Sequence, residues 1–308
     1  MSEPQTQGAE GPSKTSGMRS LSALPARLDA VTEMAERSRV LASIGKSVGG
    51  IFDRVVRPGP VKDLLAGSWL RHPLHPVLTD VPIGAWTAAE ALDLMAGPRY
   101  DAAVNGLVGF GVVTSIPTAV TGLSELSDVV TGRDRALGTL HALTNISAIT
   151  LFAGSYVARR RGRTPFGRAL SLTGFLTVLA GGFLGGHLSY RRGIGVDQTT
   201  FEPPLGDWTD AMAVTDLRDG KPTKVRVGTT EVLVFRDGAA IHAVANRCTH
   251  RGGPLDEGEI AHGAVRCPWH QSAFDLATGE VVQGPATAPQ PSYQVRTRDG
   301  RVELRSRP

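Results

Sequence analysis

Long apolar runs separated by short polar turns fill the middle of the chain. Four of them reach about 20 residues, the length that an α-helix needs to cross the hydrocarbon core of a bilayer. The last three are rich in Gly, Ala, Ser and Thr, as packed membrane helices often are, whereas the first contains Asp80, Glu90 and Asp93. We therefore expect a four-helix membrane domain over residues 67–196; a soluble four-helix bundle is the alternative. The expected helices are 77–97, 102–126, 136–158 and 169–190.

The residues before this domain form two segments that differ in composition. Residues 1–20 are polar and rich in Gly and Ser, which predicts a disordered arm. Residues 21–66 form an amphipathic helical segment, because apolar residues recur there at helical spacing among arginines and lysines. Such a helix either rests on a membrane surface or packs on the rest of the protein, and the sequence does not choose. Arg57-Pro58-Gly59-Pro60 ends the periodic run.

The pattern changes after Tyr190, where the apolar runs stop. Residues 197–206, which include Phe201-Glu202-Pro203-Pro204, read as a linker. Residues 207–308 show short alternating segments with turn signals, which predict an all-β domain. Asp237-Gly238 and Asp299-Gly300 each separate two such segments, so we expect two β-hairpins. The predicted fold is thus multidomain: an all-α transmembrane bundle followed by an all-β domain.

Charge and cysteine content exclude two classes of protein. The net charge is +4, and residues 207–308 contribute none of it, with 13 Lys+Arg against 13 Asp+Glu. The basic excess lies in arginine pairs that flank apolar runs, without a long basic stripe, so a nucleic-acid-binding protein is not expected. The chain has 2 cysteines, which excludes a disulfide-rich scaffold and leaves no spare thiol if both bind a metal.

Both cysteines belong to a paired motif in the β domain. Cys248-Thr249-His250 is followed, 16 residues later, by Cys267-Pro268-Trp269-His270. Tetrahedral zinc also uses two Cys and two His, but its sites typically group the two Cys together and the two His together. Here each loop supplies one of each. That arrangement suits a [2Fe–2S] cluster in which one iron takes both thiolates and the other takes both imidazoles.

The two segments C-T-H-R-G-G-P-L and C-P-W-H-Q-S-A-F-D resemble the cluster loops of Rieske domains. The resemblance covers about residues 205–304. It implies that Cys248 and Cys267 bind one iron and that His250 and His270 bind the other. It also implies a proline loop over the cluster, for which Gly284-Pro285-Ala286-Thr287 is the matching stretch. This loop is expected to limit solvent and to leave the imidazole edges of His250 and His270 exposed, as the exit for electrons.

The departures from the family point to its ferredoxin-like, low-potential branch. Rieske proteins of quinol:cytochrome c complexes carry an extra disulfide, where this sequence has Gly253 and Trp269. The family's tyrosine that donates to a cluster-ligand sulfur is matched by Phe274, while Ser272 remains available to a bridging sulfide. Because fewer hydrogen bonds to sulfur stabilise the reduced cluster less, we expect a potential in the lower part of the roughly −150 to +300 mV Rieske range.

Four further histidines fall in the predicted membrane domain. His72 and His75 precede its first helix, His141 lies near the start of the third and His187 near the end of the fourth. Since successive helices alternate in direction, all four are expected at the end of the bundle to which the β domain is attached. They are candidates for binding haem b, a quinone head group or a metal ion; hydrogen bonding within the bundle is the simpler alternative. The His-Pro-x-His-Pro opening also resembles an uncharacterised bacterial four-helix membrane-domain family, over about residues 67–196, which implies no activity.

These features predict a membrane-anchored one-electron carrier that uses a low-potential Rieske [2Fe–2S] cluster. The electron donor and acceptor are unidentified proteins, with a membrane quinone as a further candidate. One alternative is a membrane quinone oxidoreductase with haem or quinone in the bundle; another is a redox sensor. A complete Rieske oxygenase is not expected, since only 38 residues, without a histidine, follow His270.

The location is expected to be the inner (cytoplasmic) membrane, crossed several times, with the Rieske domain in the cytoplasm. The positive-inside rule hardly separates the two orientations. The lack of a disulfide fits a reducing compartment. Against this, the Arg159–Arg161 cluster resembles a twin-arginine export signal, which would place the Rieske domain outside.

Overall fold

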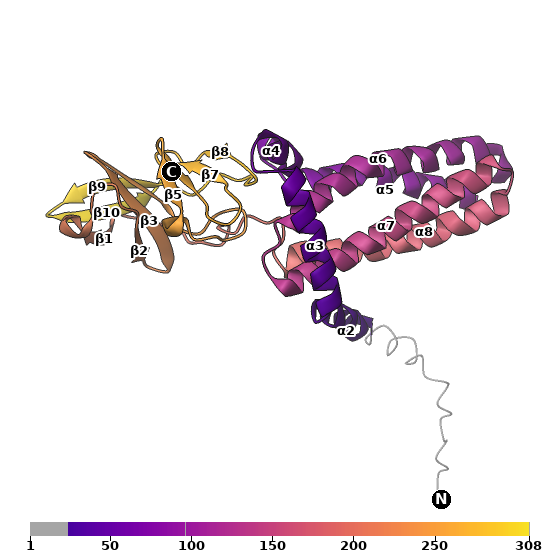
Figure 1. Cartoon of the computed structure of the whole chain (residues 1–308), viewed down its shortest axis with the longest axis horizontal. Coiled ribbons are helices and arrows are strands. Elements are labelled where there is room, and N and C mark those ends of the chain that lie inside the picture. The colour runs from indigo at the N-terminus through magenta and orange to yellow at the C-terminus, as the bar shows by residue number, and fades with distance from the viewer. Residues whose placement is uncertain (1–23, 96, 308) are drawn as a thin grey trace, which may run out of the picture.

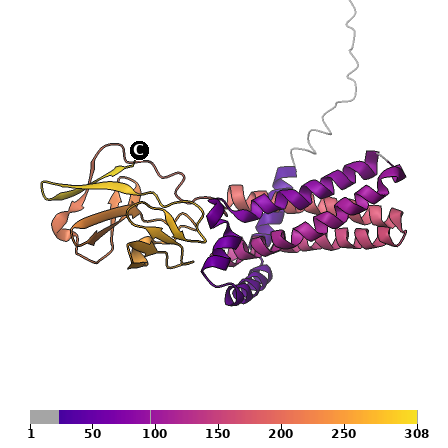
Figure 2. The same cartoon turned by 90° about the horizontal axis from the view of Figure 1, so that it is seen from above.

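The computed structural model describes residues 24–95 and 97–307, so the arm predicted at residues 1–20 lies outside the described residues. Within them the chain forms a helical part, residues 24–191, and a β part, residues 209–306. Figures 1 and 2 show that the two parts lie end to end, with the β part at one end of a long helix bundle. The order of elements therefore agrees with the fold class predicted from the pattern.

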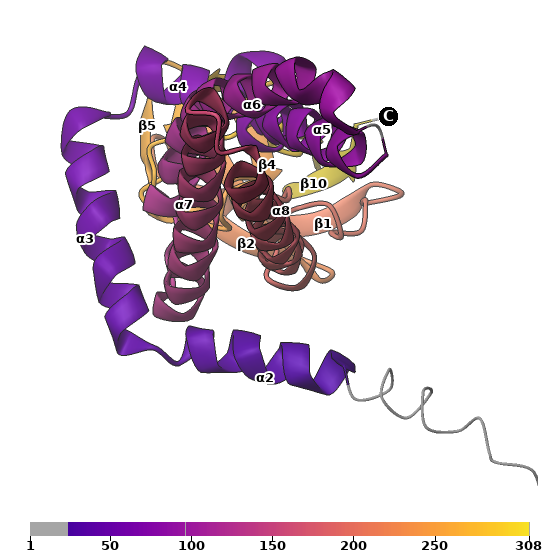
Figure 3. The ribbon, with the colours of Figure 1, turned by 90° about the vertical axis from the view of Figure 1, so that its right-hand side faces the viewer.

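The N-terminal segment forms two consecutive helices, where the apolar periodicity suggested one. The break falls at Ser38, whose hydroxyl accepts a hydrogen bond from the Leu41 amide at 3.3 Å and so caps a new helix. Viewed along the bundle, the two helices cover two of its sides (Figure 3). The elements before the bundle are α2 (Leu24–Glu36), α3 (Arg39–Val55), α4 (Pro60–Ala66) and η1 (Ser68–Leu70).

Four antiparallel helices make the bundle, and they run side by side along its length (Figures 1 and 2). Aromatic and small residues fill its centre: the Trp86 ring stacks on Phe152 with centroids 4.2 Å apart, among buried Ala89, Val108 and Ala148. The helices are α5 (Leu74–Met95), α6 (Asp101–Ser127), α7 (Gly132–Arg160) and α8 (Thr164–Gly186), with η2 (Gly97–Tyr100) before α6 and the π-helical turn η3 (His187–Arg191) after α8.

The predicted count of four apolar spans is wrong by one. Among the described residues, three helices are long and apolar enough to cross a membrane: Asp101–Ser127, Gly132–Arg160 and Thr164–Arg191. Helix α5 is excluded because it carries Asp80, Glu90 and Asp93. The carboxylate of Asp93 turns into the bundle, where it pairs with Arg159 and with Arg168. Arg159, which suggested an export signal, thus has a structural partner inside the bundle.

The β part consists of three antiparallel sheets, and both predicted hairpins are present, as β3–β4 and β9–β10. The sheets have the strand orders β1-β10-β9, β2-β3-β4 and β5-β6-β7-β8. Their strands are β1 (Thr209–Ala213), β2 (Thr223–Val227), β3 (Thr230–Asp237), β4 (Ala240–Ala245), β5 (Glu259–Ala261), β6 (Ala264–Arg266), β7 (Ala273–Asp275), β8 (Val281–Gln283), β9 (Tyr293–Arg298) and β10 (Arg301–Ser306).

Two apolar cores hold these sheets together. One lies between the sheets of β1-β10-β9 and β2-β3-β4 and includes Val232, Val302 and Leu304, all without exposed surface. The other joins Leu233 and Phe274 to both cysteines. Because the second core lies beneath the loops that carry Cys248 and Cys267, it fixes those loops relative to each other.

Candidate metal centre

Two loops with the same backbone hydrogen bonding present the paired motif. In the first, the Cys248 amide donates to the Gly253 carbonyl (2.9 Å) and the Gly252 amide to the Cys248 carbonyl (2.8 Å). In the second, the Cys267 amide donates to the Ser272 carbonyl (2.8 Å) and the Gln271 amide to the Cys267 carbonyl (3.1 Å). The fourth residue after each cysteine, Gly252 or Gln271, has a positive φ, of 76° and 66°. The backbone after each cysteine therefore turns in the same way, although the histidine follows two residues later in the first loop and three residues later in the second.

The structure brings the four side chains of the motif together. The rings of His250 and His270 meet edge to face, with centroids 5.0 Å apart, and the thiols of Cys248 and Cys267 are buried beside each other. The Nδ1 atoms of both rings are buried without a hydrogen-bond partner. Buried polar atoms are nearly always satisfied. Two orphaned imidazole nitrogens next to two thiols thus fit a metal cluster bound at these atoms.

The protonation states of the four groups also suit metal ligands. Burial lowers the pKa of His250 well below its usual value and that of His270 to about 4, so both rings are neutral near pH 7. A hydrogen bond with the Cys248 thiol lowers the pKa of Cys267 to about 7, and the same contact, with burial, raises the pKa of Cys248. Removing the second proton is thus left to the metal, which deprotonates a coordinating thiol.

No three side chains among the described residues form a compact His, Cys, Asp or Glu group able to hold one ion. A structural zinc site needs four ligands around a single ion. A [2Fe–2S] cluster with two irons asks for only two protein ligands on each. One pair of adjacent thiols and one pair of adjacent imidazoles match that requirement.

Hydrogen bonds with neighbouring residues hold the two cysteine loops in place. The buried Gln290 amide group donates to the Ala245 and Arg247 carbonyls (2.8 and 2.7 Å) and accepts from the Thr249 amide (3.1 Å). The Ser272 hydroxyl accepts from the Ala286 amide at 3.0 Å, which ties the second loop to the Pro285 loop and leaves the hydroxyl proton free to donate elsewhere. Gln290 gave no signal in the sequence, since it lies outside both motifs.

The other residues of the predicted surroundings lie close to the two cysteine loops. Phe274 has no exposed surface and belongs to the core that contains both cysteines. Gly253 lies against the second loop: a Cβ there would lie 2.7 Å from the Cys267 sulfur and 3.1 Å from the Trp269 ring. Trp269 itself is 44% exposed. The two positions that carry a disulfide in one Rieske branch are thus adjacent here, filled by a glycine and an aromatic ring.

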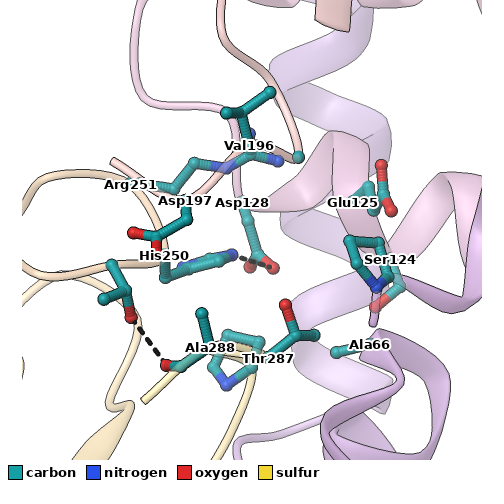
Figure 4. A pocket seen from close by; sticks show the side chains of 14 residues that line it. Ala66, Ser124, Glu125, Asp128, Val196, Asp197, His250, Arg251, Thr287 and Ala288 are labelled. Carbon is teal, nitrogen blue, oxygen red and sulfur yellow. Dashed lines mark hydrogen bonds and ion pairs between the residues drawn. The ribbon is translucent and has the colours of Figure 1, made fainter. Parts of the chain in front are cut away.

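The outer edge of His250 faces the helical part, although the sequence suggested that both histidine edges are open. Its Nε2 lies 3.6 Å from the Asp128 carboxylate, at the end of α6, and the side chain is 13% exposed (Figure 4). Asp128 also pairs with Lys62 of α4 at 3.0 Å. Burial raises the pKa of Asp128, and the Lys62 ammonium opposes this.

Figure 4 shows a pocket at this junction, with Arg251 among the residues that line it. The Arg251 Nε and Nη1 atoms are buried without a hydrogen-bond partner, and the charges of Glu125 and Asp128 act on this cation. Neither Lys62 nor Arg251 was singled out by sequence reasoning. Arg251 could have been noted as the residue directly after a candidate ligand, while Lys62 carries no such signal.

The four membrane-domain histidines separate into one pair and two single residues. The rings of His75 and His141 approach edge to face, with centroids 6.4 Å apart. Their Nδ1 atoms are hydrogen-bonded to the Thr118 and Gly181 carbonyls, at 2.9 and 3.0 Å. His187 lies 3.7 Å from Glu36 of α2, and His72 is exposed. The Nδ1 atoms of His75 and His141 thus take part in hydrogen bonding within the bundle.

The fold and the paired loops define a β domain of the iron–sulfur-binding kind attached to a membrane-type helix bundle. Comparison with known families agrees: the Rieske [2Fe-2S] domain matches residues 207–294, and a family described as predicted membrane protein (DUF2231) matches residues 71–198. The chain belongs to the Rieske [2Fe-2S] family. Rieske ferredoxins are electron carriers, so the β part is a Rieske electron-transfer domain that holds a [2Fe–2S] cluster.

The similarity to individual proteins covers about a third of this chain. The anthranilate 1,2-dioxygenase ferredoxin subunit of Burkholderia cepacia is 33% identical over 103 residues, which are 33% of this chain and 95% of the relative. Apoptosis-inducing factor 3 of Mus musculus is 34% identical over 93 residues, 30% of this chain but only 15% of the relative's length. The solved ferredoxin of carbazole 1,9a-dioxygenase from Nocardioides aromaticivorans IC177 is 28% identical, with a TM-score of 0.32, over 33% of this chain and 100% of that one.

Proposed function

We propose that the protein is a membrane-anchored one-electron carrier whose cluster is bound by Cys248 and Cys267 on one iron and by His250 and His270 on the other. The observation that carries this assignment is the pair of orphaned, buried Nδ1 atoms beside two buried thiols. Three apolar helices support the anchor. We further propose residues 67–196 as the membrane domain and 207–308 as the cluster domain, with 197–206 as the linker.

The bound cluster supplies a site that gains and loses one electron, and the protein residues set the conditions for this. The two neutral imidazoles favour the added electron on the iron that they bind, since they bring no negative charge. Buried Leu255, Phe274 and Ala286 keep water from the thiolate side. The Pro285 loop closes over the second loop through the Ala286 amide. The packed core on the thiolate side therefore changes little when the electron arrives, which favours fast transfer.

A low potential follows from the residues around the sulfur atoms. Phe274 offers no hydroxyl where a tyrosine would donate to a ligand sulfur, and Ser272 is the nearby side-chain donor in this loop. With fewer hydrogen bonds to sulfur, the reduced cluster is less stabilised. We place the potential in the lower part of the roughly −150 to +300 mV Rieske range.

The partners follow from the relatives. One is named as the ferredoxin subunit of a dioxygenase, and a solved complex joins a reduced oxygenase to an oxidised ferredoxin. We propose a reductase as electron donor and an oxidoreductase as acceptor, at the cytoplasmic face of the inner membrane. A quinone or haem centre in the bundle is the second candidate function, and the adjacent rings of His75 and His141 are the observation that favours it.

Spectra of the detergent-purified chain test both functions. We expect the reduced protein to give the EPR and visible signals of a Rieske cluster, with two irons per chain and no extractable haem. A b-type haem band that disappears in His75→Ala and His141→Ala would instead establish a second redox centre. Purified protein that contains stoichiometric zinc and no iron would overturn the proposed electron-carrier function.

A further inference from the structure

The contact between the Rieske domain and the helical domain is built around the candidate ligand His250. The carboxylate of Asp128 lies 3.6 Å from the His250 Nε2 atom, and the two side chains are only 8% and 13% exposed. If Nδ1 binds iron, Nε2 is the nitrogen that carries the proton and points outward. A carboxylate from the membrane domain therefore faces the one open edge of a cluster ligand (Figure 4).

The position of Asp128 is held from the membrane side. The Lys62 ammonium pairs with it at 3.0 Å, and also donates to the Ser124 carbonyl (2.9 Å) and the Ser127 hydroxyl (3.0 Å). These bonds fix Lys62 at the end of α6, so Asp128 has little freedom to turn away. Across the contact, Arg251 lines the same pocket as Glu125 and Asp128.

Two further contacts join the Rieske domain to the helical domain. Arg71 forms an ion pair with Glu280 at 2.7 Å. Gly284 fits so closely against the helical domain that a Cβ there would lie 2.1 Å from the Ser68 hydroxyl and 2.8 Å from Asp63. Contacts at three places on the Rieske domain define the docked arrangement in which Asp128 meets His250.

We propose that Asp128 is a positioning residue supplied by the membrane domain, which stabilises the oxidised cluster through His250 and links domain docking to the redox state. A metal-bound histidine whose other nitrogen faces a carboxylate becomes a more electron-rich ligand. A negative charge at this distance also opposes the arrival of an electron. The proposal rests on the proposed ligand role of His250.

The link to docking is a thermodynamic necessity. If contact with Asp128 makes reduction less favourable by some factor, reduction must weaken this contact by the same factor. The Lys62 and Arg251 cations act in the opposite sense, so the claim concerns the contribution of Asp128 itself. Reduction by one electron from a reductase-type donor thus loosens the docked arrangement and opens the His250 edge.

The test is a redox titration of the full chain in detergent, followed by EPR. We expect Asp128→Asn to raise the equilibrium constant for reduction about tenfold, which is 59 mV for one electron. Asp128→Glu, which keeps the charge, should stay near the parent value. Glu231→Gln removes the exposed ion pair with Arg226, which lies within the Rieske domain and outside the domain contact. It is the matched control, expected to leave the midpoint unchanged.

Hydrogen exchange supplies the second readout. In the parent protein, amides 284–290 and 125–131 should exchange faster after reduction by dithionite, and this difference should shrink in Asp128→Asn. An unchanged or lower midpoint in an Asp128→Asn protein that keeps its Rieske signal would overturn the proposal. If the parent chain shows no Rieske signal, the proposed function itself fails, so the two failures are distinguishable.

A second surface carries an independent inference. Helix α3 lies across the bundle at the end next to the Rieske domain (Figure 1). Its packed face is made of the buried glycines Gly45 and Gly49, where a Cβ would lie 2.2 Å from Thr139 and 3.2 Å from Ser127. The absence of side chains at these two positions lets the helix lie directly on α7 and α6.

An apolar stripe lies beside the packed face of α3 and has no cover within the described residues. All five of its side chains are exposed, Val55 at 79% and Val40 at 69%. On a helical wheel the packed face separates this stripe from Lys46 and Asp53. Asp53 is close enough to His270 and Asp128 for its charge to act on both, so it looks toward the Rieske domain. The stripe consists of Val40, Ile44, Val48, Ile51 and Val55.

The stripe therefore looks the other way, along the bundle, toward the region where α6 exposes Val113 and Ile116. We infer that α3 lies in the plane of the membrane surface, with this stripe buried at the boundary between head groups and acyl chains. Exposed Arg39, Lys46 and Arg54 then meet the head groups and water. The inference rests on the bundle spanning the membrane, which makes the stripe continuous with the lipid-facing surface.

Spin labels on single introduced cysteines in liposomes test this placement. A label at Ile51→Cys should be accessible to oxygen and protected from a water-soluble nickel chelate, as at Val113→Cys, with the reverse at Lys46→Cys. Nickel access at Ile51 with protection at Val113 would overturn the surface placement alone. Nickel access at Val113 would overturn the membrane bundle. Protection at Ile51 that appears only at a high protein-to-lipid ratio would show that a second copy of the chain covers the stripe. That result would also overturn the placement at the membrane surface.

Discussion

Replacing His270 by cysteine lowers the midpoint potential of the cluster by about 100 mV or more. The comparison that gives this scale is between Rieske clusters, at roughly −150 to +300 mV, and plant-type ferredoxin clusters with four thiolates, at roughly −400 mV. One anionic thiolate in place of a neutral imidazole stabilises the oxidised cluster. His270 is the candidate ligand to change because its Nδ1 is an orphaned buried atom and its ring has no acidic partner among the ion pairs of the described residues.

The measurement is an EPR-monitored redox titration of the purified chain. His242→Cys is the matched control, because His242 lies on β4 opposite Phe235 and outside both cluster loops, and its midpoint should not move. A His270→Cys protein that retains a cluster with an unchanged midpoint would refute the ligand assignment. Loss of the cluster in His270→Cys but not in His242→Cys would still agree with it.

The sequence predicted those helices and strands that depend on residues close together in the chain. Alternating segments around Asp237-Gly238 and Asp299-Gly300 form hairpins in the structure, because a two-residue turn leaves the strands no other partner nearby. The apolar runs of the bundle form helices, whose hydrogen bonds likewise join residues close together in the chain. The number of spans was harder to predict, since the acidic residues of α5 are acceptable only when Arg159 and Arg168, far along the chain, reach Asp93.

The metal centre could also be predicted from the sequence, because all four candidate ligands lie in two short motifs. What surrounds it could not be predicted: Asp128, Lys62 and Gln290 lie 40 to 186 residues from the nearer of Cys248 and His250, as the numbering shows. No periodicity or spacing signals a pairing of that kind. The expectation that both histidine edges are open failed at His250 for this reason, since the sequence gives no information about how two domains dock.

The buried charges of the bundle give the second large effect. Asp93→Ala should destabilise the helical part by about 3–5 kcal/mol, the usual cost of leaving one partner of a buried pair alone. The Asp93 and Arg159 side chains are 6% and 3% exposed, so water cannot solvate the guanidinium left behind. Ser155 and Ser171 still accept hydrogen bonds from Arg159, but neither carries a compensating charge.

Thermal unfolding in detergent, followed by far-UV circular dichroism, measures this loss. Glu33→Ala is the matched control: it breaks the exposed Arg37–Glu33 pair, 75% and 62% exposed, and should cost less than about 1 kcal/mol. The Rieske signal of Asp93→Ala should survive below its lowered transition, because Asp93 touches no part of the β domain. Equal transitions in the two variants would mean that Asp93 is neutral or solvated, and that the acidic residues of α5 do not depend on the arginines of α7 and α8.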